Sequence, residues 1–583
     1  MCNIEIQTLQ ERLFGHRVSE PIALDDIFLA RGDELDIVDE KAFERDPHGL
    51  LRAFYWVNTE VQLSRFSTKL MRALWHGATL FIDDAFRADP VNKATFLSII
   101  KMPKGVYQAL ERMYAFGILE RFLPEFQPTV GQMQHDLYHI FTVDQHTIQT
   151  LRNVRHFARS EYAHEYPLCS AIMANYPYPW VITLAALFHD IGKGRGGNHA
   201  QLGAMEAEAF AKRFNLIPEE TELLVFLVRE HLLMSKVAQK EDISDPEVIA
   251  RFASQVKDRR HLDGLYCLTV ADIRATSLKV WTPWKAELLE SLYHASVNYL
   301  QNASSKSDDV IFENTLSARR REAATYLEGK VEPAYREALW KRMDVVYLMR
   351  HSAREIAWHT EVLSQYLKAI KAHPEAPIRP CVACREAPVE GYEIMLSLPD
   401  QKDVFLKAVA FLGSLRLSVM DARIHTSADG HVLDTFLVID KYQHYSAQEL
   451  IERVEREMPE AMLASELSPR PMGKLSRRSK VFPLTPKLQM KPDAWGKSWL
   501  LSLVTTDRVG LLYDLSEVFA RWSLNIETAK IATLGERVED VFRLSGDALS
   551  RDETLLAIEA DLMNVLAPPR SGLGAAKNAR VPY

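Results

Sequence analysis

The chain has 583 residues, of which 47% are hydrophobic and 25% are charged, as in an ordinary globular protein. This length is too great for one hydrophobic core and predicts roughly three to five domains. The net charge of -8 disfavours a protein whose main partner is a nucleic-acid backbone, so we expect no nucleic-acid partner.

Cysteine content and hydropathy indicate the cellular compartment of the protein. The five cysteines are few and odd in number, as is usual for reduced thiols. The sequence has no apolar run of about 18 residues, and its first residues carry charges where a secretory signal would be apolar. We therefore predict a cytoplasmic protein with no membrane span.

The first 370 residues are predicted to be helical in two parts. Residues 1–130 are interpreted as a helical linker or packing domain, because apolar residues such as Leu70 and Leu74 recur at helical spacing. Residues 131–370 contain Trp180–Phe188, which is apolar on all sides and therefore predicts a buried central helix.

The pattern changes after the second helical part. Residues 371–390 predict a linker, because four prolines interrupt the helical periodicity. Beyond it, short strands alternate with helices in the order β-α-β-β-α, and this order occurs twice. We predict two ferredoxin-like βαββαβ domains, over 391–480 and 497–569, followed by a disordered tail over 570–583.

Histidines and aspartates in the middle third predict a metal site. The candidate ligands are His146, His189, Asp190, His199, His231 and Asp272. Imidazole and carboxylate groups suit a divalent cation. His231 and Asp272 lie at helical spacing from apolar residues, so both should face inward. A buried, ionised Asp272 would need a counter-charge, which a metal would supply.

The context of these residues adds detail. Thr142 and Gln145 form a capping-box pattern, which predicts that a helix begins just before His146. Lys193 follows the His189-Asp190 pair in a glycine-rich turn and would neutralise phosphate charge there, unless it is an ordinary solvated lysine. Any single inward histidine is more often a core residue than a ligand, but the whole combination favours a metal centre.

The pattern H…HD…H…H…D resembles the HD superfamily of metal-dependent phosphohydrolases. By this resemblance, one metal would be held by His146, His189, Asp190 and Asp272. A second would be held by His199 and His231, with Asp190 bridging. The expected cofactor is Mg²⁺ or Mn²⁺, and a metal-activated water would attack phosphorus, with Asp190 and Lys193 as catalytic residues.

Two further histidines, His135 and His139, lie just upstream of the predicted ligand helix. They would either line the substrate cleft or have ordinary structural roles.

The C-terminal repeat resembles ACT domains, small regulatory modules that bind amino acids where the first strand meets the first helix. In the second copy, the residues expected to bind ligand are Asp507, Arg508, Gly510, Leu511, Asn525 and Ile526. Gly510 would permit close backbone approach, and the helix N-terminus would offer N–H donors to a carboxylate. The matching turn of the first copy, 400–405, lacks the glycine. The alternative is a pair of modules used only for packing.

An HD domain followed by two ACT domains resembles the bifunctional uridylyltransferase/uridylyl-removing enzymes of nitrogen signalling, which act on the PII protein. The segments GQMQHDLYHIFTVDQHTI, LFHDIGKGRGGNHAQLGA and LTVADIRATS carry the likeness. By resemblance the chain would hydrolyse the tyrosyl-UMP bond of uridylylated PII, with UMP as product and glutamine as effector. No Gly-Ser motif with paired aspartates is present, so we expect the family's nucleotidyltransferase domain to be absent.

Two other functions stay open. HD and ACT domains also occur together in guanosine-tetraphosphate hydrolases, although those carry a synthetase domain and one ACT unit. A non-catalytic protein that binds PII and glutamine would keep the domains, but it would have no reason to retain every metal ligand.

Overall fold

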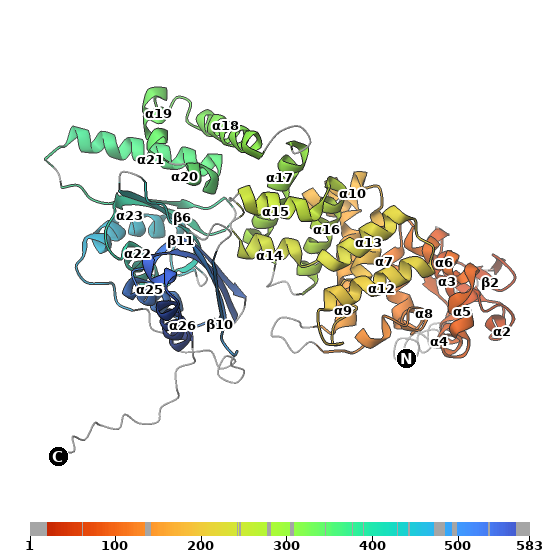
Figure 1. The fold of residues 1–583 in the computed structure, drawn as a ribbon. Helices are drawn as coiled ribbons and strands as arrows, with labels where there is room; N and C mark the ends of the chain where they lie inside the picture. The colour runs from red at the N-terminus through yellow and green to blue at the C-terminus, as the bar shows by residue number, and fades with distance from the viewer. Residues whose placement is uncertain are drawn as a thin grey trace, which may run out of the picture. The chain divides into compact units, whose positions relative to one another are not determined.

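A computed structural model describes residues 20–60, 62–133, 141–241, 243, 246–276, 281–302, 308–343, 345–375, 377–388, 390–427, 430–440, 443–470, 484–492, 498–534 and 537–566. The chain divides into two compact units, the first made of Met1–Ser235 and Ala253–Trp281, the second of Lys236–Phe252 and Thr282–Tyr583. Figure 1 shows the elements of each. Among the described residues, no helix is both long enough and apolar enough to cross a membrane.

From residue 20 onward, the first unit contains a small sheet in the order β1-β2-β3-β4, in which only β3 and β4 are parallel. Its strands are β1 (Ile22–Ala23), β2 (Phe28–Arg31), β3 (Glu34–Ile37) and β4 (Arg65–Phe66). The helical interpretation of residues 1–130 therefore did not include this sheet. Strands of two to four residues are too short to show a period-two pattern, which is why the sequence did not reveal them.

The helices of this region, two of which lie between β3 and β4 in the chain, bury Phe54, Phe96 and Leu110, none of which has exposed surface. The start of α6 (Pro90–Ile100) is well marked in the sequence, because Asp89 is its N-cap and Pro90 is its first residue. The Asp89 side chain accepts hydrogen bonds from the N–H groups of Val91 and Asn92. The helices are α2 (Ala42–Arg45), α3 (Gly49–Thr59), α4 (Thr68–Phe81), α5 (Asp84–Ala88), α6 (Pro90–Ile100), α7 (Val106–Ala115) and α8 (Leu119–Phe122).

The helices that carry the predicted metal ligands surround α11 (Pro179–Phe188). Every residue of α11 from Val181 to Phe188 is buried, which confirms the predicted central helix. It contacts α9, α12, α13 and α16. The bounds are α9 (Val143–Phe157), α10 (Pro167–Asn175), α12 (His199–Arg213), α13 (Pro218–Glu230) and α16 (Arg259–Thr276). In the chain, α13 is followed by α14 (Leu233–Lys240) and α15 (Pro246–Val256), most of whose residues belong to the second unit.

The second unit is built on one eight-stranded sheet in the order β5-β6-β8-β7-β11-β12-β10-β9. The strands are β5 (Cys381–Glu386), β6 (Tyr392–Pro399), β7 (Ser418–Arg423), β8 (His431–Ile439), β9 (Lys487–Pro492), β10 (Trp499–Thr506), β11 (Asn525–Leu534) and β12 (Arg537–Ser545). The two predicted repeats are its two halves, and they join where β7 pairs with β11, with Arg423 opposite Thr528.

Helices cover both faces of this sheet (Figure 1). One face packs in a single core against α22 (Val404–Ser414), α23 (Ala447–Leu463), α25 (Leu511–Arg521) and α26 (Asp552–Leu566). On the other face, a second core joins Met395 and Leu433 of the first half to the preceding helices. Those helices are α18 (Asp308–Tyr326), α19 (Pro333–Arg342), α20 (Val345–Arg350) and α21 (Ala353–Ala372). The helix before them in the chain is α17 (Pro283–Asn302).

Each half of the sheet differs from the predicted βαββαβ order in one respect. The outer edge strand, β5 or β9, precedes the repeat in sequence and takes the place expected for a closing strand. Part of the predicted linker 371–390 is therefore β5, paired along its length with β6. Cys381 and Cys384 lie on opposite faces of β5, one in each core, as the alternation of a strand requires.

Buried histidines lie where α20 and α21 meet the first half of the sheet. His351 Nε2 is 2.8 Å from Thr435 Oγ1 on β8, and Tyr347 Oη is 2.6 Å from His359 Nδ1. Burial lowers the pKa of His351 to about 4 and that of His359 well below its ordinary value. Both imidazoles are therefore neutral in the folded unit at pH 7.

These histidines predict acid sensitivity of the second unit. An unfolded histidine protonates near pH 6.5, whereas His351 resists protonation down to about pH 4, so stability is complete above pH 6.5 and is lost as pH falls toward 4. At pH 5 the loss should be about 2 kcal/mol for His351 alone. This loss of stability is measured by hydrogen exchange of β8 and α21 at pH 7 and pH 5, corrected for intrinsic exchange rates.

The variant His351→Gln should lose less protection on acidification than the native chain. His294→Gln, at an exposed position of α17, is the matched control and should behave as the native chain does. Equal protection of β8 at both pH values would show that these imidazoles do not limit stability.

Candidate metal centre

His146 reaches the site from the first turn of α9, and its side chain is fully buried. Thr142 is the N-cap residue, as the sequence predicts, but its side chain makes no capping hydrogen bond. The predicted capping box is therefore wrong. A buried carboxylate that the sequence did not single out, Asp144, instead accepts from Tyr114 Oη at 2.7 Å and from Gly131 N at 2.9 Å.

The same local device orients two of the other imidazoles. His189 ends α11 and His231 ends α13, each as the C-cap residue. His189 Nδ1 lies 2.8 Å from Ala186 O, and His231 Nδ1 lies 2.7 Å from Val228 O. Each Nδ1 donates to the carbonyl oxygen three residues earlier, so each Nε2 is the ring nitrogen that faces the site.

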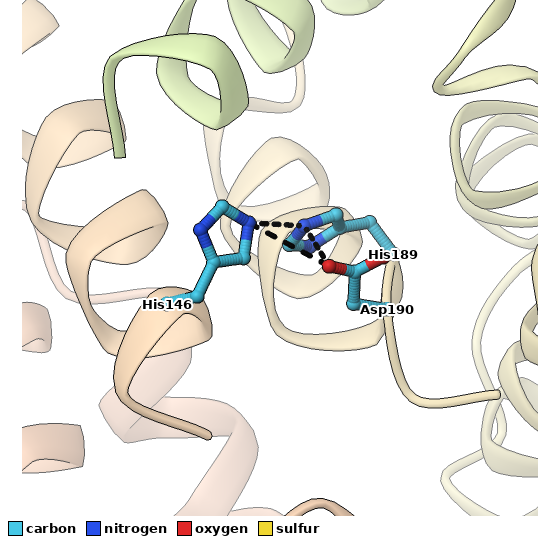
Figure 2. A group of neighbouring side chains, drawn as sticks. All are labelled: His146, His189 and Asp190. Carbon is cyan, nitrogen blue, oxygen red and sulfur yellow. Dashed lines mark hydrogen bonds and ion pairs between the residues drawn. The ribbon is translucent and has the colours of Figure 1, made fainter. Parts of the chain in front are cut away.

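A first group of side chains meets at Asp190 Oδ2 (Figure 2). His189 Nε2 lies 3.3 Å and His146 Nε2 lies 3.6 Å from this oxygen, and the two Nε2 atoms are 3.2 Å apart. Asp272 Oδ1, on α16, is 2.9 Å from His146 Nε2. Three imidazole or carboxylate ligand atoms this close together can hold a metal ion.

A second group meets at the other oxygen of the same carboxylate. His199 Nε2 lies 3.7 Å and His231 Nε2 lies 3.9 Å from Asp190 Oδ1. Both Nε2 atoms are buried and have no hydrogen-bond partner among the described residues. A buried nitrogen lone pair without a donor is costly, and a divalent cation would satisfy both at once. The donor set therefore fits a second ion.

The charge states of Asp190, His199 and His231 suit metal binding, whereas His189 holds a proton that a cation would displace. Burial would lower the pKa of His189, but Asp190 and Asp272 raise it to about 10. Burial would raise the pKa of Asp190, but His189 and Lys193 hold it well below its ordinary value. Burial lowers the pKa of His231 to about 4 and also lowers that of His199. Carboxylate and neutral imidazole are the forms that bind cations.

Lys193 lies beside the first group rather than in solvent. Its Nζ is 2.6 Å from Asp190 Oδ2, and its side chain is only 20% exposed. The ammonium of Lys193 is thus held at the carboxylate of Asp190, which both groups share. His135 and His139 fall outside the described residues.

The strand–helix turn of the second ACT-like half has the predicted left-handed glycine. Gly510 is the N-cap of α25, with φ 81°. Asp403, the N-cap of α22 in the first half, has φ 64° although it is not a glycine, so the turn keeps its shape in both halves.

The other predicted ligand residues of this half are placed unevenly. Leu511 and Ile526 are buried in the core, whereas Asn525 is exposed at the start of β11. The guanidinium of Arg508 lies 2.6 Å from Asp514 and donates to Val565 O, so it braces α25 against α26.

Family models match three parts of the chain. The uridylyltransferase GlnD third-domain model matches residues 28–122, and the uridylyltransferase GlnD fifth-domain model matches residues 313–362. The HD domain model matches residues 143–272, which include every side chain of both groups.

Curated relatives match almost the whole chain. A protein of Bordetella avium named bifunctional uridylyltransferase/uridylyl-removing enzyme is 44% identical over 97% of this chain and 65% of its own length. Proteins with the same name from Chromobacterium violaceum and Ralstonia nicotianae are 43% and 42% identical, over 94% and 97% of this chain. The chain spans 63% and 65% of those two relatives.

Metal titration tests the shared carboxylate. We expect the Asp190→Asn substitution to weaken Mn²⁺ binding at both positions by about tenfold or more, because an amide cannot replace a bridging carboxylate. His231→Gln should weaken the binding of only one of the two Mn²⁺ ions. Isothermal titration calorimetry measures both, and His76→Gln, on the exposed surface of α4, is the control. Native Mn²⁺ affinity in Asp190→Asn would contradict this assignment.

Proposed function

We propose, because this chain belongs to the family of bifunctional uridylyltransferase/uridylyl-removing enzymes, that its HD domain hydrolyses the phosphodiester between UMP and a tyrosine of uridylylated PII. The observation that carries the proposal is the meeting of four histidines at the two oxygens of Asp190, with Asp272 beside one of them. The relatives' name supports the uridylyl substrate, and the sparse cysteines support a cytoplasmic location.

A divalent cation, Mg²⁺ or Mn²⁺, is the proposed cofactor. One ion would be held by His146, His189, Asp190 and Asp272, and a second by His199, His231 and Asp190. Such ions supply Lewis acidity and lower the pKa of bound water. The low pKa of Asp190 and Asp272 keeps both carboxylates ionised at neutral pH, so both can bind a cation without losing a proton.

Lys193 is proposed to act on the phosphoryl group. Its ammonium lies against Asp190 Oδ2 and could turn toward a phosphoryl oxygen with a small side-chain movement. A cation placed there before the substrate arrives stabilises the additional negative charge of the transition state. Asp190 would thus position both the cations and the lysine.

The second ACT-like half is the proposed glutamine sensor. Its turn offers the backbone N–H groups at the start of α25, next to Asp507 and Gly510, to an amino-acid carboxylate. Asn525, exposed at the start of β11, offers a side-chain amide. Arg508 would contribute by bracing this turn through Asp514, and Leu511 and Ile526 by packing behind it.

Release of UMP tests the proposed reaction. The full chain should release UMP from uridylylated PII in the presence of Mn²⁺, and glutamine should increase the rate. Asp190→Asn should reduce the rate by about a thousandfold or more, and Lys193→Met by about tenfold to a hundredfold. Chromatography of the nucleotide product measures each rate.

The same assay separates the other candidate functions. Hydrolysis of guanosine tetraphosphate with no release of UMP would identify the stringent-response reaction instead. Tight binding of uridylylated PII without turnover, at saturating Mn²⁺ and glutamine, would identify a non-catalytic binding protein.

Glutamine binding tests the sensor. Gly510→Ala should weaken glutamine binding about tenfold or more, because a side chain at φ 81° strains the turn by roughly 1–2 kcal/mol and crowds the ligand. Gly430→Ala is the matched control, since Gly430 has φ 73° at the hairpin of the first half. Equal loss in both variants, measured by calorimetry, would exclude the turn at Gly510 as the glutamine site.

A further inference from the structure

The turn that follows the His189-Asp190 pair is shaped around another side chain. Lys193 N donates to Asp190 O at 3.0 Å, and the chain then passes through Gly194 with φ 74°. A Cβ atom on Gly194 would lie 1.5 Å from the terminal amide of Gln132. The glycine is therefore required both by its backbone conformation and by the closeness of Gln132.

Gln132 bonds to the peptide unit that joins Lys193 and Gly194. In the orientation that satisfies both groups, its amide nitrogen donates to Lys193 O and its amide oxygen accepts from Gly194 N, each at 3.2 Å. One side chain thus fixes both the carbonyl and the N–H of the turn that carries Lys193. Methionine has the same length as glutamine but can make neither bond, and glutamate can only accept.

Gln132 is itself held at both backbone groups. Its N–H donates to Thr129 O at 3.2 Å, and its carbonyl accepts from Val143 N, the first residue of α9, at 3.0 Å. The preceding residue, Gly131, donates to the buried carboxylate of Asp144. The segment is therefore fixed to the same turn of α9 that carries His146.

Tyr114 secures this arrangement from a different helix. Its hydroxyl, on α7, donates to Asp144 Oδ2 at 2.7 Å, and Asp144 is only 1% exposed. The contact joins the region matched by the GlnD third-domain model to the first helix of the HD domain.

We propose that Gln132 is a positioning residue for the phosphohydrolase reaction: it fixes the Lys193–Gly194 turn so that the lysine ammonium stays at Asp190 Oδ2. This inference rests on the proposed function for its effect on rate, but not for its effect on Lys193. A displacement of about 1 Å in a catalytic group can lower a rate by about a hundredfold, so a side chain that holds such a turn affects turnover without touching substrate.

Turnover measurements separate positioning from a general loss of structure. Gln132→Met should lower kcat for UMP release about tenfold or more, with a smaller change in KM and with Mn²⁺ affinity unchanged. In a Lys193→Met background it should cause no further loss, because the two residues act as one unit. Additive losses, or a parallel loss of Mn²⁺ binding, would overturn the proposal. Gln108→Met, exposed on α7, is the matched control.

Chemical labelling tests the same idea without turnover. We expect acetic anhydride to modify Lys193 about fivefold faster in Gln132→Met than in the native chain, because the released turn exposes an amine that is now paired. The exposed Lys104 serves as internal reference in mass spectrometry. Unchanged labelling of Lys193 would overturn the proposal even if the chain hydrolyses uridylylated PII. Faster labelling in a chain that releases no UMP would refute the proposed function alone.

Discussion

A single buried carboxylate, that of Asp190, faces two groups of imidazoles, one at each oxygen. His146 and His189 lie near Oδ2, and His199 and His231 lie near Oδ1. An ionised carboxylate at 2% exposure is tolerable only if nearby cations compensate it. The helices around α11 must therefore bring these side chains within a few ångströms of one carboxylate.

The fold meets this requirement with helix ends. His189 and His231 are C-cap residues whose Nδ1 atoms are tied to a carbonyl of the last turn, so the imidazoles are oriented before any cation arrives. Lys193 and Gln132 then add a second layer, in which one side chain pairs with the carboxylate and the other fixes the turn. Pre-organisation of this kind reduces the cost of ordering the site during reaction.

The sequence alone was enough to single out those features that residue type and spacing reveal. The six candidate ligands and the buried helix Trp180–Phe188 stood out in this way, and so did the two repeats. Asp144 and Gln132 did not, because their partners lie 30 and about 60 residues away and only the fold brings them together. Strands β5 and β9 were missed for a similar reason, since edge strands are defined by the neighbour with which they pair.

Crystals of the full chain soaked in Mn²⁺ test the central claim most directly, through anomalous scattering of the ion. The account predicts one peak beside Asp190 Oδ2, among His146, His189 and Asp272, and a second beside Oδ1, between His199 and His231. Peaks elsewhere, with none at Asp190 under saturating Mn²⁺, would contradict it.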